Sequence, residues 1–87
     1  SALTQQVAYE VAGAGVRVNC LAPATILTGR LEQAIPLDRR SELAATYPLG
    51  RLGRPDDVAQ AALFLASDAS SWITGITLDI AGGQVIR

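Results

Sequence analysis

Residues 17–28, which read RVNCLAPATILT, decide the fold of this chain. Apolar side chains, several of them β-branched, recur through residues 16–22, and this pattern predicts a buried β-strand. Pro23 has no backbone N–H, so we expect the chain to leave the sheet there and to continue through Thr25 and Thr28. Ligands of open α/β sheets bind just outside the carboxyl ends of the strands. This segment is therefore predicted to form one wall of a binding crevice.

The segments around this strand predict alternating helices and strands. Apolar spacing and the positions of Gly and Pro predict helices at residues 1–12, 31–34, 39–46 and 55–67, and a second strand at residues 76–80. The charged segment 29–49 is either a lid over a site or a solvated surface connection. The order helix, strand, lid, helix, strand implies two parallel strands joined by a right-handed crossover, which is an α/β fold.

The sequence also predicts where the first helix ends and which side chains are buried. Gly13 and Gly15 are expected to end the first helix. Cys20, the one cysteine, is expected to pack in the strand as a small hydrophobe, and Trp72 is expected to anchor packing. The helix at residues 55–67 is expected to bury a stripe made of Val58, Ala62, Leu63, Leu65 and Ala66.

Two motifs could be interpreted as a catalytic, metal or dinucleotide site, but their positions in the sequence favour structural roles. Asp56 and Asp57 could be acid/base groups or metal ligands, but adjacent residues do not share a helix face. They follow Pro55, so we interpret all three as the start of a helix, where carboxylates face the positive end of the dipole. The pair Gly13 and Gly15 fails as a dinucleotide motif, because a strand follows the glycines and a helix precedes them.

The composition excludes several classes of function. The 87 residues carry a net charge of −1, contain no His, and have only Arg as basic residues. A Ser-His-Asp or Cys-His centre, a Walker-type Lys and a His-based metal site are thereby excluded, and we expect no metal. Without a basic excess or a run of about 20 apolar residues, we expect neither nucleic-acid nor membrane binding. The chain starts at Ser1 inside a predicted helix, so we expect a piece of a longer protein.

Three segments resemble the short-chain dehydrogenase/reductase family. Residues 17–28 are similar to its Arg-Val-Asn-x-[Val/Ile/Leu]-x-Pro-Gly-x-[Ile/Val]-x-Thr pattern, with Ala24 in place of Gly. Residues 48–59, PLGRLGRPDDVA, resemble its Pro-Leu-x-Arg-x-Gly-x-Pro-acidic-acidic pattern. Residues 64–83 resemble its Phe-Leu-Ala-Ser to Asp-Gly-Gly segment, with Ala81 in place of Asp.

The resemblance implies a fold and an activity. Residues 1–87 would form the C-terminal part of a Rossmann-like, doubly wound parallel sheet, a single partial domain with its substrate loop at about residues 29–49. The complete protein would be a cytoplasmic NAD(P)-dependent oxidoreductase acting on a small alcohol or carbonyl substrate. Its catalytic Ser, Tyr and Lys and its Gly-rich cofactor motif would lie upstream, so no catalytic residue is assigned here. Tyr47 does not qualify, because Pro48 and Gly50 forbid the helix that a Tyr-x-x-x-Lys pair needs.

The resemblance also implies which residues meet the cofactor, NAD or NADP. Pro23 and Ala24 would back the nicotinamide ring. The backbone of Ile26 would bind the carboxamide, and the Thr28 hydroxyl would contact the carboxamide or a phosphate. Thr25 completes this wall.

Family members pair through the last helix and strand, so a homo-oligomer is expected. A second hypothesis remains: the 87 residues alone form a non-enzymatic packing or oligomerisation module, because a two-stranded fragment leaves an open sheet edge and an uncovered apolar helix face. We also expect the isolated chain to be inactive.

Overall fold

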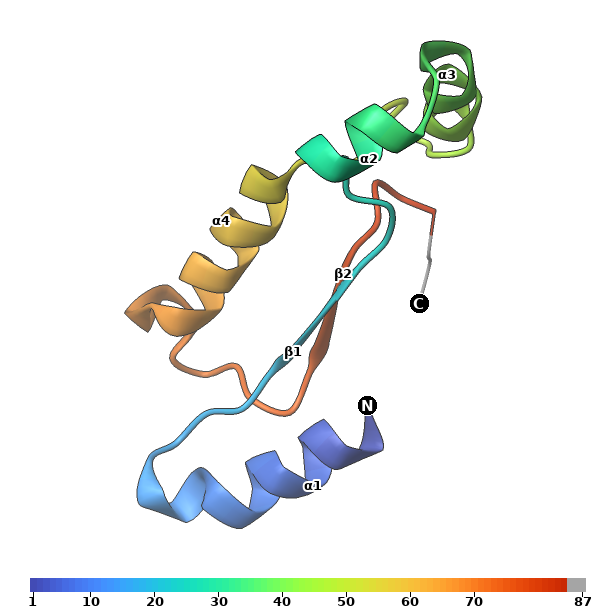
Figure 1. Cartoon of the computed structure of the whole chain (residues 1–87). Coiled ribbons are helices and arrows are strands. Elements are labelled where there is room, and N and C mark those ends of the chain that lie inside the picture. The colour runs from blue at the N-terminus through green and yellow to red at the C-terminus, as the bar shows by residue number, and fades with distance from the viewer. Residues whose placement is uncertain (85–87) are drawn as a thin grey trace.

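A computed structural model describes residues 1–84. The chain forms four α-helices, two short 3-10 helices and two strands within these residues (Figure 1). In chain order these are α1 (Ala2–Val11), η1 (Ala12–Ala14), β1 (Cys20–Pro23), α2 (Gly29–Ala34), α3 (Leu37–Ala45), α4 (Pro55–Ala66), η2 (Asp68–Ser70) and β2 (Thr77–Ile80). The helices predicted from the sequence are all present, with bounds shifted by one or two residues at most ends.

The two strands form a parallel pair, as predicted. Cys20 is opposite Thr77, and Pro23 is opposite Ile80. In Figure 1 the strands run between α4 and α1, and α2 and α3 lie beyond the ends of the strands. The α/β fold class predicted from the sequence is confirmed.

The first strand is shorter than predicted and begins only at Cys20. The residues before it bond to the segment that precedes β2, largely through side chains. Val18 N–H donates to Thr74 Oγ1 at 3.0 Å, and the Asn19 amide both donates to Ile73 O and accepts from Ile76 N–H, each at 3.2 Å. These polar side chains replace the ladder that the apolar pattern had predicted for residues 16–19.

Pro23 lies inside β1, although we expected the strand to end before it. The N–H groups of Cys20 and Ala24 donate to Ile76 O, just before β2, and to Ile80 O at its end, at 2.9 and 3.0 Å. Because N–H groups alternate along a strand, the nitrogen of Pro23 faces the opposite edge. Its missing N–H therefore costs no hydrogen bond to β2, and the chain leaves the sheet one residue later.

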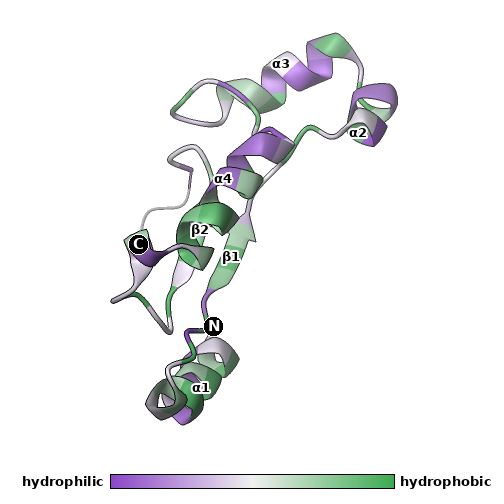
Figure 2. Cartoon of the chain, turned by 90° about the vertical axis from the view of Figure 1, so that its left-hand side faces the viewer, coloured by the Kyte–Doolittle hydropathy of each residue, from purple (hydrophilic) through white to green (hydrophobic). Residues whose placement is uncertain are grey.

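The apolar face of α4 is less covered than predicted. Val58 and Leu65 are half-buried, whereas Ala62, Leu63 and Ala66 are exposed. The helix contacts β1, β2 and η2, but the other three residues of the predicted stripe meet solvent. Figure 2 shows hydrophobic residues gathered along α4 and the strands, and mostly hydrophilic residues on α2 and α3.

Trp72 is 99% exposed, so the prediction that it anchors packing is wrong for the residues described. It follows η2 in a turn, where no described element covers it. Cys20 is half-buried in β1, and Gly15 ends the first helical segment with φ +77°. The buried apolar core of residues 1–84 consists of Ala8, Tyr47, Leu52 and Ala81.

The described chain is elongated. Its radius of gyration is 15.6 Å, against about 12 Å for a compact domain of this length. The helices α2 and α3 extend the molecule away from the sheet (Figure 1). Within residues 1–84 no helix is both long and apolar enough to cross a bilayer.

Candidate functional site

A cavity of about 290 Å³ lies at the carboxyl ends of both strands. This is the edge of the sheet where the sequence predicted a crevice. Ala24 and Thr25 line it from the end of β1, and residues 79–82 line it from the end of β2. The rest of the lining comes from the segment between α3 and α4 and from the start of α4: Tyr47, Leu49, Arg51, Gly53 and Asp57.

Tyr47, in the segment between α3 and α4, holds Thr25 in place. Its ring is 6% exposed. The Tyr47 hydroxyl donates to Thr25 Oγ1 at 2.9 Å and accepts from the Thr25 N–H at 3.1 Å. The segment that follows β1 is therefore positioned by a residue 22 positions later in the chain.

Replacing Tyr47 with Phe should lower the free energy of unfolding by about 1–1.5 kcal/mol, because the Thr25 N–H then loses its acceptor in a partly buried place. Urea unfolding of the purified protein measures this loss. Thr25→Val removes only the Thr25 hydroxyl, which accepts from the Tyr47 hydroxyl, and leaves the Thr25 N–H with its acceptor. Its effect on stability should therefore be smaller. The two changes should also combine with less than additive cost. Full additivity would show that the two side chains do not interact.

Gly53 and Ile26 form a parallel bridge between the loop after β1 and the segment before α4. Gly53 N–H donates to Thr25 O at 3.0 Å, and Leu27 N–H donates to Gly53 O at 2.7 Å. A Cβ at position 53 would overlap Ile26 Cδ1, which is the end of a flexible side chain, and would lie 3.3 Å from Thr25 O, so this close approach favours glycine. Because backbone groups alternate along an extended segment, the N–H of Ile26 itself points away from Gly53.

The other predicted cofactor residues lie apart from one another along the segment from the end of β1 to the start of α2. Pro23 is exposed at the edge of β1, and Ala24 lines the cavity. Positive φ angles occur only at glycines within residues 1–84, so the backbone of Ala24 is compatible with its methyl group. Thr28 is exposed and caps α2, where its hydroxyl accepts from Leu31 N–H at 3.3 Å. Of the five residues, only Ala24 and Thr25 line the cavity.

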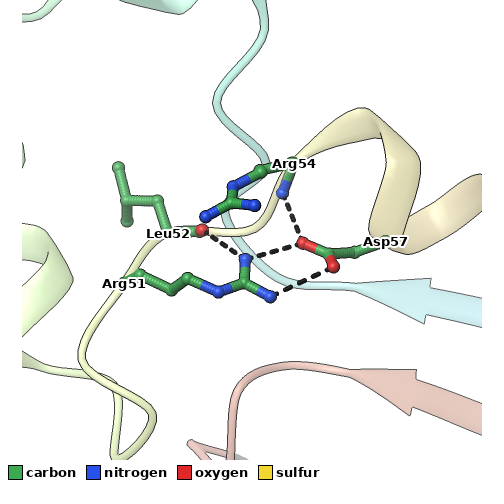
Figure 3. Close-up of polar contacts among 4 residues, drawn as sticks. All are labelled: Arg51, Leu52, Arg54 and Asp57. Atoms are coloured by element: carbon green, nitrogen blue, oxygen red, sulfur yellow. Dashed lines mark hydrogen bonds and ion pairs between the residues drawn. The ribbon is translucent and has the colours of Figure 1, made fainter.

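An ion pair joins the cavity to the start of α4 (Figure 3). The Arg51 guanidinium donates to both carboxylate oxygens of Asp57, at 2.7 and 3.1 Å, and also to Leu52 O. Asp57 additionally accepts from Arg54 N–H at 2.7 Å, while its own N–H donates to Arg54 O. The helix start predicted at Pro55 with acidic residues in its first turn is confirmed.

The hydrogen bonds from Arg51 and then from Arg54 lower the pKa of Asp57 from 3.8 to about 2. The same pairing raises the pKa of Arg51. A carboxylate whose pKa is lower in the folded protein stabilises the fold above its unfolded pKa, and this contribution is lost as the pH falls. The ion pair therefore stabilises the protein above about pH 4 and ceases to do so near pH 2.

Asp57→Asn should remove this acid-sensitive contribution. The stability of the wild-type protein should decline more steeply than that of the variant between pH 4 and pH 2. Urea midpoints measured across that range test the expectation. Asp56→Asn is the matched control, because Asp56 occupies the same helical turn but makes none of these contacts. Equal pH slopes for the wild type and Asp57→Asn would contradict the assignment.

The turn after β2 closes one side of the cavity. Leu49 N–H donates to Gly82 O at 3.0 Å, and Gln84 Nε2 donates to Thr46 Oγ1 at 3.3 Å. Gly83 has φ +89°, and a Cβ there would lie 3.0 Å from Pro48 Cβ. Glycine is therefore required both by the backbone angle and by the close approach of Pro48.

Sequence reasoning missed the roles of two residues, Tyr47 beside the cavity and Arg17 before β1. Tyr47 was considered only as a catalytic tyrosine, although aromatic side chains contribute large areas to protein cores and a buried Tyr hydroxyl usually has a hydrogen-bond partner. Arg17 was used only as part of a motif. The guanidinium of Arg17 donates to Ser67 O, Ser70 O and Ile73 O, and a lone charge in an apolar run requires such partners.

Parallel strands flanked by helices, with a cavity at their carboxyl ends, are features of doubly wound α/β proteins. Comparison with known proteins identifies the family. The family described as enoyl-(acyl carrier protein) reductase matches residues 1–84. The chain belongs to the short-chain dehydrogenase/reductase family, as its motifs predicted.

Individual relatives share both sequence and structure with this chain. It is 46% identical over 84 residues to the 3-oxoacyl-(acyl-carrier-protein) reductase FabG of Thermotoga maritima, covering 97% of this chain and 34% of that protein. The crystal structure of hydroxysteroid dehydrogenase from Escherichia coli matches with a TM-score of 0.87 and 39% identity, covering 98% of this chain and 36% of the other. YwfH, an NADPH-dependent reductase involved in bacilysin biosynthesis, matches with a TM-score of 0.86 and 28% identity, covering 99% and 36%. The chain spans about a third of the length of the curated relatives it matches.

Proposed function

We propose that residues 1–87 are the C-terminal part of an NAD(P)-dependent oxidoreductase that acts on an alcohol or carbonyl group of a small molecule. The observation that carries this proposal is the loop after β1, which hydrogen bonds to Gly53 and Tyr47 fix at the edge of the sheet. Relatives named as reductases and dehydrogenases support it. The catalytic Ser, Tyr and Lys and the Gly-rich motif are proposed to lie upstream of Ser1.

The loop has features that fit a nicotinamide ring. Ala24 presents a small methyl group, and Pro23 is exposed at the strand edge that carries no described neighbour. Ile26 directs its N–H away from Gly53, toward the side where a carboxamide oxygen could accept it. We assign Pro23 and Ala24 to the ring, and Ile26 and Thr28 to the carboxamide. A bound nicotinamide supplies or accepts a hydride.

In this proposal the residues of this chain position the loop and the cofactor and take no part in the chemical step. Thr25 uses its N–H and its hydroxyl oxygen to bind Tyr47, so its role is to fix the conformation of the loop. Thr28 caps α2, and its hydroxyl hydrogen remains able to donate to the cofactor. The segment with α2 and α3 would exclude water from the reacting atoms as a lid. We further propose that the complete enzyme is cytoplasmic and homo-oligomeric.

A second candidate function is a non-enzymatic packing or oligomerisation module. The exposed apolar residues of α4 favour it, because Leu63 is 64% and Phe64 42% exposed. The sheet also has only two strands among the described residues, which leaves edges able to pair. Sizing chromatography of the 87-residue chain discriminates: self-association supports this module, and a well-behaved monomer counts against it.

Sequencing the coding region upstream of Ser1, followed by an assay of the complete protein, tests the enzymatic proposal. We expect a Gly-rich turn and a Tyr-x-x-x-Lys segment upstream, and oxidation of NADH or NADPH with members of a carbonyl panel. The 87-residue chain alone is the control and should show no turnover. A stop codon directly before Ser1, or turnover by the isolated chain, would refute the proposal.

A further inference from the structure

The segment with α2 and α3, which we propose as a lid, is attached to the rest of residues 1–84 mainly at its two ends. Neither helix contains a buried residue, and both make few contacts with the strands or with the other helices. In Figure 1 the two helices lie beyond the ends of the strands. A movement of the lid therefore reaches the sheet mainly through the residues that hold these two ends.

The lid begins directly after the loop that we assign to the nicotinamide. Leu27 N–H donates to Gly53 O at 2.7 Å, and the Thr28 hydroxyl caps the first turn of α2. These contacts hold the start of the lid against the segment that precedes α4. They do not involve α3, which is attached to the sheet edge by a different residue.

Tyr47, which follows α3, makes this second attachment. Its N–H donates to Ala44 O at 3.1 Å, so its backbone follows the last turn of α3. Its buried ring lies against the turn after β2, where a Cβ at Gly82 would be 3.5 Å from Tyr47 Cδ1. Its hydroxyl donates to Thr25 Oγ1 and accepts from Thr25 N–H. One side chain thus links the end of α3 to the loop after β1.

The position of the Tyr47 hydroxyl depends on α3 and on the loop together. If α3 is displaced, Tyr47 either moves with it or loses its hydrogen bond to Ala44. If the Tyr47 hydroxyl moves, the Thr25 N–H loses its acceptor in a partly buried place, which is costly. The favoured position of the loop is therefore tied to that of α3. An energetic coupling between two binding segments acts equally in both directions.

We propose that Tyr47 couples cofactor binding to the position of the lid. This inference rests on the proposed function, because it takes the loop after β1 as the nicotinamide site. A cofactor that fixes the loop also fixes Thr25, and through Tyr47 it fixes the end of α3. The lid is consequently more ordered when the nicotinamide is bound. Tyr47 acts here as a positioning residue and takes no part in the chemical step.

Amide hydrogen exchange of the complete protein, followed by mass spectrometry with and without NADH or NADPH, tests the coupling. In the wild type the cofactor should slow exchange in α2 and α3 by roughly fivefold or more. Tyr47→Phe keeps the ring and removes both hydrogen bonds to Thr25. This variant should still bind the cofactor, but the slowing in α2 and α3 should fall below about twofold.

The ratio of the exchange rates with and without cofactor separates coupling from simple stabilisation. If Tyr47 only stabilised the fold, Tyr47→Phe would speed exchange by the same factor in both states, and the ratio would stay at its wild-type value. Thr25→Ser keeps the hydroxyl and should retain the full slowing, whereas Thr25→Val keeps only the bond to the Thr25 N–H and should retain part of it. Tyr9→Phe is the matched control, because Tyr9 is 88% exposed on α1.

The outcomes distinguish this inference from the proposed function. A wild-type ratio in Tyr47→Phe with the cofactor bound would overturn the coupling and leave the proposed function intact. If Tyr47→Phe does not fold, Thr25→Val decides, and full slowing in that variant would contradict the coupling. Failure of the wild-type complete protein to bind either cofactor would refute the proposed function, and the coupling with it.

Discussion

Replacing Arg17 with Gln should lower the free energy of unfolding by about 2–3 kcal/mol. The Arg17 guanidinium donates to three backbone carbonyls and to one hydroxyl, at 2.9–3.3 Å, all in the segment between α4 and β2. Ser70, which supplies the hydroxyl and one carbonyl, is only 1% exposed. Glutamine is too short to reach these acceptors together, so buried carbonyls lose their donor.

Urea unfolding of the purified protein measures the effect, with Arg30→Gln as the matched control. Arg30 is exposed on α2, so its replacement should change stability by less than about 0.5 kcal/mol. Arg17→Lys should recover only part of the loss, because a single ammonium cannot reproduce the planar fork of the guanidinium. Equal stability of Arg17→Gln and Arg30→Gln would show that these contacts do not support the fold.

Gly53→Val should have the second large effect, with a loss of about 1–3 kcal/mol in stability. The new side chain would overlap Ile26 Cδ1 and crowd Thr25 O. The bridge between the two segments would separate, and with it the loop that we assign to the nicotinamide. In the complete enzyme we therefore also expect at least a tenfold fall in kcat/KM, because small displacements of positioning groups are costly.

Gly29→Val is the control for this change. A Cβ at Gly29 meets nothing within 4 Å, and the residue lies in the first turn of α2. Its stability should stay within about 0.5 kcal/mol of the wild type. If Gly53→Val retained both stability and activity, the close approach of residues 26 and 53 would not be needed for function.

The sequence predicted where the candidate site lies but not most of the residues that line it. Pro23 and the threonines placed a crevice wall at the end of β1, and the cavity does lie there, lined by Ala24 and Thr25. Thr28, by contrast, lies at a helix start outside the lining, where its hydroxyl accepts from Leu31 N–H. The opposite wall comes from Tyr47 and from the turn after β2, which no local pattern connects to Thr25.

The sequence by itself determined the features that depend on neighbouring residues. Pro55 with Asp57 marked the start of α4, and Gly15 marked the end of the first helical segment. Such signals act within one or two turns of chain, through backbone angles and caps, so they can be read from the residue order. The order of helices and strands predicted the parallel pairing of β1 and β2, and the motifs identified the family.

Only the tertiary structure decided which distant side chains meet and which apolar residues are covered. Arg17 bonds to residues 50–56 positions away, and Tyr47 bonds to Thr25 across 22 positions. The exposure of Leu63 and Trp72 was likewise missed, because an apolar pattern states what a residue prefers and not whether another element covers it. Burial and long-range hydrogen bonds depend on the path of the whole chain, whereas helix starts and ends depend on a few adjacent residues.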